Sequence, residues 1–422
     1  MPGGHAVVAV DLGTSKVCAI VAETQADGRT AILGVGLCSA RGMAKGVITD
    51  LDEAATVVGR ALERAERNSG YQLLSAYVSI SGAHLHSTNT RGIVGLPREH
   101  PEVSAAEVAR VLDAASTTPA FARDDILHVL PRTYTLDGQQ GVADPIGMIG
   151  TRLEVDAHII SGSATAIHNV RRAMERAGVA IDDLVPEPLA AAEAVLTAAE
   201  REMGVALVDI GAGTTDLAIY LEDAIWHTAV LPIGGNHLTN DLSIVLEVPF
   251  ESAEQLKVAH GRALPDAAAD PSDDDRVQAE GFEGTPRMVS RQTAQEVIEA
   301  RLEQLLHLVQ KELRASGYDG ALPGGLVLTG GTALLPELAD LAKQVTGLRA
   351  RIGTPRRLAG LGDSLSGPAF ATGVGLARWA LRQQETARQP RRERRNGQRE
   401  RRGGRGERAA GGISRWLREL LP

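Results

Sequence analysis

Two stretches of the chain share one hydrophobic pattern, in which two apolar runs are separated by a short polar segment. Residues 7–21 read VVAVDLGTSKVCAIV, and residues 206–220 read ALVDIGAGTTDLAIY. Short apolar runs bounded by glycine are typical of buried β-strands, so each stretch predicts two strands joined by a tight turn. The same unit appears twice, roughly 200 residues apart, and a pattern that recurs at this distance indicates an internal duplication.

The turn of the second unit has the composition of a phosphate-binding loop. Gly211 and Gly213 leave backbone N–H groups free to approach a bulky anion, and Thr214 and Thr215 add hydroxyl groups beside them. Asp209 ends the first strand, where it would face a phosphate-bound cation through water molecules. Taken alone, this turn fits an ordinary glycine-rich hairpin equally well.

The first unit favours the phosphate-binding loop over an ordinary hairpin, because it repeats the same order of strand, aspartate, turn and strand. Asp11 occupies the position of the strand-ending aspartate, and Lys16 follows the turn, where it would supply a point charge to a phosphate. Two such hairpins, one from each half of the chain, can face each other. The pair therefore predicts a site in which the phosphates of a nucleotide are clamped between the hairpins.

Hydrophobic spacing elsewhere predicts a mixture of helices and strands. Helices are expected at 51–69, 104–115, 164–177, 186–196, 252–260, 295–315 and 367–381, and strands at 31–36, 76–81, 90–96, 126–136, 150–156, 157–160 and 182–185. Ser104 and Glu107 form a possible capping box, and Asn236 is expected to cap a helix that follows Gly234 and Gly235. The acidic, alanine- and proline-rich segment 263–280 is expected to be a loop.

Three further groups of residues stand out in the predicted elements. Glu187 lies at the start of a predicted helix, where it is either a helix-dipole partner or a group that orients an attacking water. Glu254 and Lys257 are one turn apart on one helix face. Gly330 and Gly331 follow a predicted strand and would let the backbone lie against a flat adenine or a ribose.

Length and composition limit the class of protein. A chain of 422 residues is expected to form two or more domains. Cys18 and Cys38 are its two cysteines, and they predict buried thiols in a reducing compartment. The N-terminal residues have no basic segment followed by an apolar one, so no secretory signal is expected. No run of about 18 apolar residues predicts a membrane span.

Charge divides the chain into two unlike parts. From Gln383 onward there are 12 Arg and 5 Glu, which gives a net charge of +7 and leaves −16 on the remainder of a chain whose total is −9. Residues 383–412 contain no apolar residue larger than Ala or Pro, so they predict a disordered basic linker. A nucleic-acid-binding role for this run is ranked lower, because it has no aromatic residue for base stacking.

The last ten residues predict an amphipathic helix. Their apolar side chains recur at helical spacing and would form one face. These are Ile413, Trp416, Leu417, Leu420 and Leu421. Ten residues cannot cross a bilayer but can lie in its interface, and the basic linker adds attraction to anionic lipids. The alternative is a small helix docked on the body of the protein.

Several of these motifs together resemble the nucleotide fold of the actin, heat-shock chaperone and hexokinase superfamily. They are VAVDLGTSK, VDIGAGTTD, PEPLAAAEA and LTGGTALLPEL. More closely, the chain is similar to the FtsA family of bacterial cell-division proteins. That resemblance depends on SISGAHLHSTNTRGIVGL, on ILHVLPRTYTLDGQQGVADPIGMIGTRLEVDAHII and on LPIGGNHLTNDL.

The resemblance implies an α/β fold of the actin type, in which two duplicated lobes surround a nucleotide cleft. The implied divisions are a first lobe at 1–82, continued at 162–195 and 367–382; an inserted α+β subdomain at 83–161; a second lobe at 196–236, continued at 318–366; and an outer subdomain at 237–317. The tail then comprises the disordered linker at 383–412 and the membrane-targeting helix at 413–422.

The resemblance also implies roles for individual residues. Asp11 and Asp209 would hold Mg²⁺ through its water shell, and Glu187 would position the attacking water. The phosphates of ATP would be bound by Gly13, Thr14, Ser15, Lys16, Gly211, Gly213, Thr214 and Thr215. Glu254 and Lys257 would lie on the ribose and adenine side, and Gly234, Gly235, Gly330 and Gly331 would complete the pocket. Ala212 replaces an acidic residue of actin, which implies slow hydrolysis.

By the same resemblance, the protein would polymerise and tether filaments of the tubulin-like FtsZ to the cytoplasmic face of the membrane at the division septum. FtsZ would bind the 237–317 subdomain, and the inserted subdomain would serve polymer contacts and later division proteins. A pilus-assembly actin homologue is the nearest alternative, and it would lack the amphipathic C-terminus; another actin-like cytoskeletal protein is a further alternative on this resemblance. A chaperone ATPase would need a substrate-binding domain after residue 382, and a sugar or acetate kinase would need a further catalytic aspartate.

Overall fold

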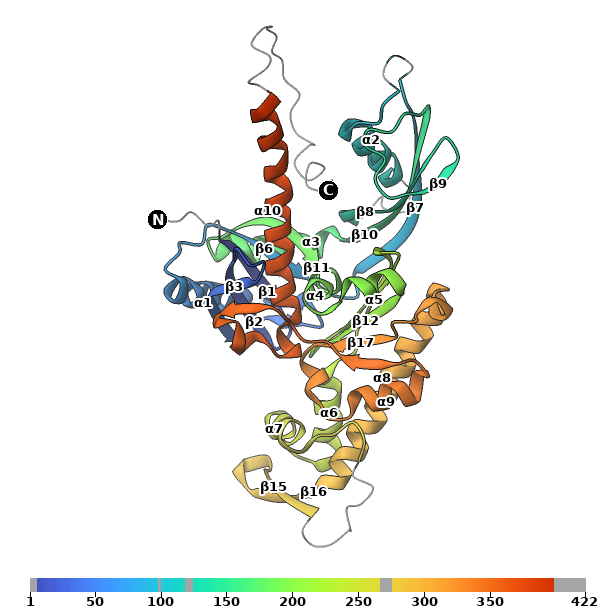
Figure 1. Cartoon of the computed structure of the whole chain (residues 1–422). Coiled ribbons are helices and arrows are strands. Elements are labelled where there is room, and N and C mark those ends of the chain that lie inside the picture. The colour runs from blue at the N-terminus through green and yellow to red at the C-terminus, as the bar shows by residue number, and fades with distance from the viewer. Residues whose placement is uncertain (1–5, 98, 100, 118–123, 266–274, 398–422) are drawn as a thin grey trace.

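The computed structural model describes residues 6–97, 99, 101–117, 124–265 and 275–397. Two main sheets repeat the same local topology (Figure 1). In the first, β1 (Val7–Leu12) pairs antiparallel with β2 (Lys16–Thr24) and parallel with β6 (Ser75–Ile80). In the second, β12 (Val205–Ile210) pairs antiparallel with β13 (Thr215–Leu221) and parallel with β17 (Leu326–Thr329). The two predicted hairpins are therefore confirmed, and they occupy equivalent positions in the two sheets.

The first lobe is a six-stranded sheet with helices on both faces. Its strand order is β11-β6-β1-β2-β3-β19, and a small β4–β5 hairpin lies beside it. The remaining elements are β3 (Thr30–Ser39), β4 (Met43–Ala44), β5 (Val47–Ile48), β11 (Ala180–Pro186), β19 (Leu358–Gly360), α1 (Leu51–Ser69), α3 (Ala164–Arg176), α4 (Glu187–Val195) and α10 (Ala371–Gly397). Alternate side chains of β1 point to opposite faces, so Val10 packs toward α1 and α3, whereas Ala9 packs toward α4 and α10.

The second lobe is a five-stranded sheet in the order β14-β13-β12-β17-β18. Its further elements are β14 (Ala224–Leu231), β18 (Ala350–Ile352), α5 (Ala198–Met203), α6 (Gly235–Leu246), α7 (Phe250–His260), α8 (Arg291–Ser316), α9 (Leu338–Thr346) and the hairpin β15 (Arg276–Glu280) with β16 (Pro286–Ser290). One face of β12 packs on the core that includes α6, α7 and α8, and the other face joins the core formed with α4 and α10. Those two helices therefore share a core with both sheets.

Residues after β6 form a separate subdomain before the chain returns to the first lobe at α3. A four-stranded sheet in the order β7-β10-β8-β9 carries a helix on one face. The elements are β7 (Leu85–Gly95), α2 (Ala105–Ser116), β8 (Asp124–Leu136), β9 (Gln139–Val142) and β10 (Arg152–Ser163). The predicted capping box is present, because the Ser104 backbone N–H donates to Glu107 and the Ser104 hydroxyl accepts from Ala106 N–H.

Several predicted elements differ from the structure. The expected strands 150–156 and 157–160 form one strand, β10, with a register shift between Asp156 and Ala157 that explains the broken pattern. The N-cap of α6 is Gly234 rather than Asn236. Part of the expected loop 263–280 is strand β15, in which Val277 and Ala279 alternate with polar residues and pair with β16.

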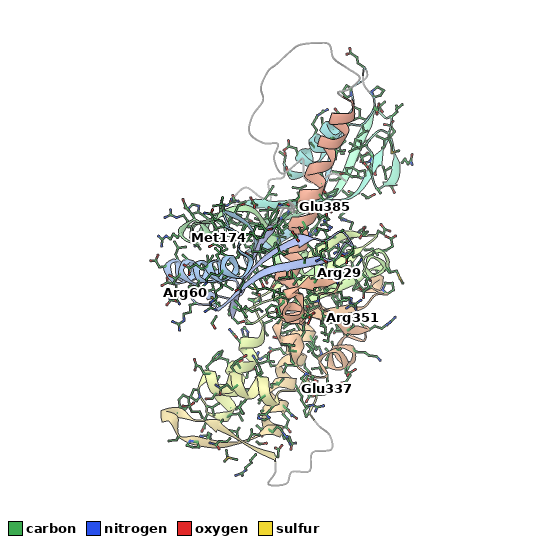
Figure 2. The ribbon with its side chains drawn as sticks, turned by 60° about the vertical axis from the view of Figure 1, so that its left-hand side comes forward. Arg29, Arg60, Met174, Glu337, Arg351 and Glu385 are labelled. Atoms are coloured by element: carbon green, nitrogen blue, oxygen red, sulfur yellow. The ribbon has the colours of Figure 1, made fainter. Side chains whose placement is uncertain are left out.

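The C-terminal helix is longer than predicted. Helix α10 continues to Gly397, so the expectation of disorder from 383 is wrong for residues 383–397. Arg, Gln and Glu are good helix formers, and extending an existing helix avoids the cost of nucleation. In Figure 2, Glu385 lies where α10 leaves the two lobes. The rest of the predicted linker and the predicted membrane helix at 413–422 lie outside the described residues.

Candidate nucleotide-binding site

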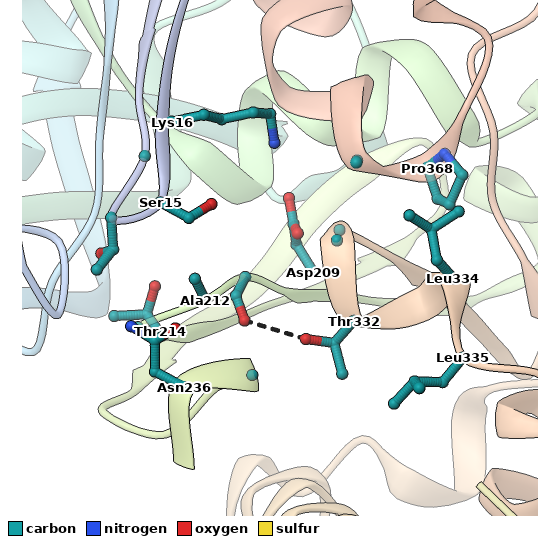
Figure 3. Close-up of a pocket in the computed structure, with 18 of the residues that line it drawn as sticks. Ser15, Lys16, Asp209, Ala212, Thr214, Asn236, Thr332, Leu334, Leu335 and Pro368 are labelled. Atoms are coloured by element: carbon teal, nitrogen blue, oxygen red, sulfur yellow. Dashed lines mark hydrogen bonds between the residues drawn. The ribbon is translucent and has the colours of Figure 1, made fainter. Parts of the chain in front are cut away.

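A cavity of about 530 Å³ lies between the two hairpins and brings together most of the predicted site. Figure 3 shows Ser15 and Lys16 on one side, Ala212, Thr214 and Asn236 on another, and Asp209 between them. The predicted residues that line the cavity are Asp11, Gly13, Thr14, Ser15, Lys16, Glu187, Asp209, Gly211, Gly213, Thr214, Gly235, Glu254, Lys257, Gly330 and Gly331. The sequence therefore identified residues that the fold gathers from both halves of the chain.

Asp11 ends β1 in a buried position at the cavity wall. It is 6% exposed, and its Oδ1 accepts a hydrogen bond of 3.0 Å from the Ser79 hydroxyl. The Leu12 N–H in turn donates to that hydroxyl over 2.9 Å. Burial raises the pKa of Asp11, and the charge of Lys16 partly opposes this effect. The carboxyl is thus oriented by the neighbouring parallel strand β6.

Asp209 occupies the equivalent position at the end of β12. It is 5% exposed, and its Oδ2 accepts a hydrogen bond of 2.8 Å from the hydroxyl of Thr372 at the start of α10. Burial raises the pKa of Asp209 to about 6, and the nearby Asp11 carboxyl contributes in the same direction. Each aspartate is therefore held by a hydroxyl from another element, and both face the same cavity.

The third turn approaches Asp209 so closely that only glycine fits there. Gly330 has a φ of +87°, and a Cβ at this position would lie 2.3 Å from Asp209 Oδ1. The Thr332 hydroxyl donates to the Gly211 carbonyl over 3.3 Å, the contact drawn as a dashed line in Figure 3. The turn after β17 is therefore bonded to the turn after β12, which fixes the floor of the cavity.

Two residues predicted for the nucleotide site, Thr215 for the phosphates and Gly234 for the rest of the pocket, do not line the cavity. Thr215 is fully buried, and its hydroxyl donates to the Ile233 carbonyl over 2.8 Å. Gly234 is the N-cap of α6, and its N–H donates to His237 Nδ1 over 3.1 Å. Both residues connect the second turn to the start of α6, so the structure gives them a supporting position behind the cavity wall.

Two more carboxyl groups join the aspartates. Glu187 is the first residue of α4 and lines the cavity; burial and the nearby Asp216, Asp11 and Asp209 raise its pKa well above the usual range. Burial raises the pKa of Asp216 to about 7, although the Ser81 hydroxyl donates to its Oδ1 over 2.7 Å. Close carboxyl groups of this kind repel one another when ionised, so a cation among them would relieve the repulsion.

The other end of the cavity is bounded by α6 and α7. Lys257 Nζ lies 2.6 Å from Glu254 Oε2 and donates to the Gly235 carbonyl over 3.2 Å. The Thr239 hydroxyl bonds to the same Glu254 oxygen over 2.5 Å. Apolar lining at this end comes from Phe250, Val258, Leu334 and Leu335. An apolar wall beside a fixed charged pair suits a flat ring with polar edges.

Sequence reasoning missed the hydroxyl groups that orient the carboxyls. Ser79 and Ser81 follow the alternation of β6, the parallel neighbour of β1, so their place at the same sheet edge was a usable signal. Asp216 was visible in the second hairpin but was given no role. Thr372 comes from the C-terminal helix, and no local pattern distinguishes it. Its contact with Asp209 arises only from tertiary packing.

The carboxyl cluster is not a preformed metal cage. In the described parts of the chain, no group of three or more His, Cys, Asp or Glu side chains is arranged to hold a metal ion directly. Mg²⁺ commonly keeps several waters and uses one or two carboxylates together with substrate phosphates. The geometry of Asp11 and Asp209 is compatible with that mode. None of the described helices has the length and apolar character needed to cross a bilayer.

Comparison with known proteins identifies the family. The family model "Cell division protein FtsA" matches residues 206–375, and the model "SHS2 domain inserted in FTSA" matches residues 82–161. The chain is 41% identical over 381 residues to the cell division protein FtsA of Pseudomonas aeruginosa, covering 90% of each protein. The chain belongs to the FtsA family. It is also 37% identical to FtsA of Bacillus subtilis, covering 90% of this chain and 85% of that protein.

Solved structures show that this FtsA-family chain has an actin-like fold. The PilM–PilN type IV pilus biogenesis complex matches with a TM-score of 0.61 at 16% identity, covering 89% of this chain and 98% of that one. MreB5 of Spiroplasma citri bound to ADP matches with a TM-score of 0.51 at 14% identity, covering 88% and 95%. The fold and the family predicted from sequence are both confirmed, and the family match favours a cell-division role over pilus assembly.

Proposed function

We propose that the cavity binds ATP with Mg²⁺ and that the protein uses this nucleotide to hold its two lobes together. The observation that carries the proposal is the pair of equivalent, buried aspartates, Asp11 and Asp209, at the ends of duplicated hairpins that face one cavity. Mg²⁺ would neutralise charge at this cluster and bind through water, and Lys16 would contact the phosphates.

The turns fit the phosphates in shape as well as in charge. A Cβ on Gly213 would lie 2.6 Å from Thr14 Oγ1, so the two phosphate turns are already close across the cavity. The Gly46 N–H donates to the same hydroxyl over 3.1 Å. Backbone N–H groups of both turns can therefore converge on one anion, although the Gly211 N–H already donates to the Thr214 carbonyl over 2.9 Å. The adenine would lie against the apolar end, beside Glu254 and Lys257.

Hydrolysis should be slow. Ala212 lines the cavity at the position where the resemblance to actin implies a second acidic residue. Glu187 is the remaining candidate for positioning an attacking water, and its carboxyl sits at the N-terminus of α4 with a raised pKa. A protonated carboxyl is a poor acceptor from water, so the raised pKa lowers the fraction of Glu187 that can act, and the bound ATP would serve mainly as a structural ligand.

The cellular role would follow from membership of the FtsA family. The protein would polymerise, bind FtsZ through residues 237–317 and contact later division proteins through the inserted subdomain. Residues 413–422 would attach it to anionic lipid on the cytoplasmic face of the membrane at the septum. The five-residue apolar face of that segment and the +7 charge of the tail support membrane attachment.

Calorimetric titration with ATP and Mg²⁺ tests the pocket. Asp209→Ala should lower the affinity at least about tenfold, because it removes a charge-assisted contact of roughly 1.5–3 kcal/mol. Asp113→Ala, on the exposed side of α2, is the matched control and should bind like the wild type. Unchanged affinity in the Asp209 variant, with cooperative thermal unfolding as evidence that it is folded, would show that the pocket is wrongly assigned.

A further inference from the structure

The inserted subdomain is hydrogen-bonded to the far edge of the second lobe. Strand β14 is the edge strand of its sheet, so alternate backbone carbonyls point away from β13. Two of these carbonyls accept bonds from β7: the Ser87 hydroxyl donates to Thr228 O over 2.8 Å, and Asn89 Nδ2 donates to Trp226 O over 3.1 Å. Side chains of one lobe's insertion therefore cover an open sheet edge of the other lobe.

A buried histidine continues this contact. His158 of β10 is 1% exposed, and its Nδ1 lies 2.7 Å from Asn89 Oδ1. Because that oxygen can only accept, Nδ1 carries the proton and Nε2 accepts from the Thr228 hydroxyl, 3.0 Å away. Burial lowers the pKa of His158 to about 3, so the ring is neutral and this tautomer is fixed. The ring thus bonds β10, β7 and β14 together.

An arginine stacked on a tryptophan completes the interface. The Arg132 guanidinium of β8 lies 3.5 Å from the centroid of the Trp226 ring, and its Nε is buried without a hydrogen-bond partner. Trp226 is itself oriented, since its Nε1 donates to Leu221 O over 2.8 Å and its ring packs edge-to-face on Tyr318 at 5.3 Å. The guanidinium therefore depends on this ring for its contact with the second lobe.

The lobe latch is defined here as Ser87, Asn89, Arg132 and His158 on the inserted subdomain with Trp226 and Thr228 on β14. The inserted subdomain is part of the first lobe by chain connectivity, because it leaves from β6 and returns to α3. The latch therefore adds a connection between the lobes, in addition to the core around α4 and α10. Its hydrogen bonds join side chains to an edge strand, and water can replace them when the latch opens.

The chain segment that leads into the inserted subdomain contacts the second phosphate turn of the nucleotide cavity. Ser81, which immediately precedes the insertion, donates to Asp216 Oδ1 over 2.7 Å and lies 3.3 Å from the Thr214 hydroxyl of the second phosphate turn. The latch is closed in the same arrangement in which Thr14 and Gly213 are in contact across the cavity. A relative rotation that separated the lobes would strain both the Ser81 contact and the latch.

We propose that the lobe latch stabilises the closed arrangement of the two lobes and so raises the affinity for nucleotide, with Arg132 as its main positioning residue. This inference rests on the proposed binding of ATP. Coupling between two sites is reciprocal, so bound nucleotide must favour the latched orientation of the inserted subdomain by the same factor. A partner that pulls the inserted subdomain away from β14 would correspondingly release nucleotide.

The test compares variants of the full chain. Arg132→Ala and Ser87→Ala should each lower the affinity for ATP and Mg²⁺, and Arg132→Ala should do so by about fivefold or more, the lower end of usual coupling factors. The matched control is Arg110→Ala, an exposed arginine on α2 of the same subdomain that pairs only with Glu107 in the described contacts. Its affinity should stay within about twofold of the wild type.

Fluorine NMR of the chain labelled with 5-fluorotryptophan reports on the environment of Trp226 in the latch. The Trp226 resonance, assigned with Trp226→Phe, should shift when ATP and Mg²⁺ are added to the wild type and should shift less in Arg132→Ala. Equal nucleotide affinities in wild type, Arg132→Ala and Ser87→Ala would overturn the latch. Failure of the wild type itself to bind ATP would instead overturn the proposed function, so the two failures are distinguishable.

Discussion

Four neighbouring carboxyl groups make the stability of this protein depend on pH: Asp11, Glu187 and Asp209, which line the cavity, and the buried Asp216. The pKa values of Asp209 and Asp216 are raised from 3.8 to about 6 and about 7 in the folded state. Between pH 3.8 and these raised pKa values, the folded state therefore binds more protons than the unfolded state. Their contribution to the free energy of unfolding is present below about pH 4 and is lost as the pH rises through about 6 to 7.

Replacing one of these carboxyls with a group that cannot ionise should restore the free energy of unfolding that is lost at high pH. Asp209→Asn keeps an acceptor for the Thr372 hydroxyl but cannot ionise. Without nucleotide, we expect it to raise the free energy of unfolding at pH 8 by on the order of 1–3 kcal/mol and to have little effect at pH 4. Thermal melting of both proteins at the two pH values measures this. An equal gain at both would mean that ionisation of Asp209 is not the cause.

Glu187 should affect turnover rather than binding. We expect Glu187→Gln to lower the rate of phosphate release from an already slow wild type, below about 1 per second, while the affinity for ATP changes by less than about twofold. Single-turnover phosphate release and equilibrium titration separate the two effects. A wild-type turnover well inside the ordinary range of about 1–1,000 per second would contradict the structural role given to ATP.

For individual residues, the sequence predicted the groups that contact the cavity better than the groups that orient them. Asp11, Asp209 and Lys16 stood out because they are polar residues inside a duplicated apolar pattern. Thr372 gave no comparable signal, because a single hydroxyl in a helix is common, and Ser79 was marked only by its place at the sheet edge beside β1. Their importance comes from which elements the tertiary fold packs against each aspartate.

Among the elements, α4 and α10 pack so closely that their contact leaves no room for a larger side chain. A Cβ on Gly375 of α10 would lie 1.8 Å from the Ala190 carbonyl of α4. Gly375→Ala should therefore force the helices apart and lower the free energy of unfolding by about 1–3 kcal/mol or more. Gly59→Ala in α1 has open space around the added methyl group and should be neutral or slightly stabilising. Denaturant unfolding compares the two, and similar values would contradict the close contact.

The elements were predictable where one physical signal dominated. Helix α1 matches its predicted bounds of 51–69 because its apolar spacing, Asp50 cap and terminal Gly70 agree. Strand β15 was missed because only Val277 and Ala279 mark its alternation, and it needs β16 to form. Helix α10 exceeded its predicted end because composition alone suggested disorder, whereas attachment to a packed helix removes the nucleation cost.

For the whole molecule, the charge division and the actin-like fold together predict that membrane attachment depends on assembly. The apolar face at 413–422 has five large side chains, each able to gain roughly 1.5–3 kcal/mol on full burial. Interfacial burial is partial, and ordering each backbone residue costs about 1–2 kcal/mol. One copy should therefore bind weakly, whereas a filament of many copies can raise avidity by about 10²–10⁴.

Liposome co-sedimentation measures this dependence. Trp416→Glu should detach the protein from anionic liposomes at any concentration, as should a chain ended at Gly412. A variant that cannot polymerise but keeps the tail should sediment only at high protein concentration. If that monomeric variant binds liposomes as tightly as the wild type, one copy of the tail is a sufficient anchor and assembly is not required.

The most direct measurement is a crystal structure of the full chain with a non-hydrolysable ATP analogue and Mg²⁺. The expected result places the phosphates between residues 13–16 and 211–214, with the metal bound through water to Asp11 and Asp209 and the adenine beside Glu254 and Lys257. A nucleotide bound elsewhere, or a cavity that remains without nucleotide at saturating concentration, would contradict the assignment of this cleft as the site that joins the two lobes.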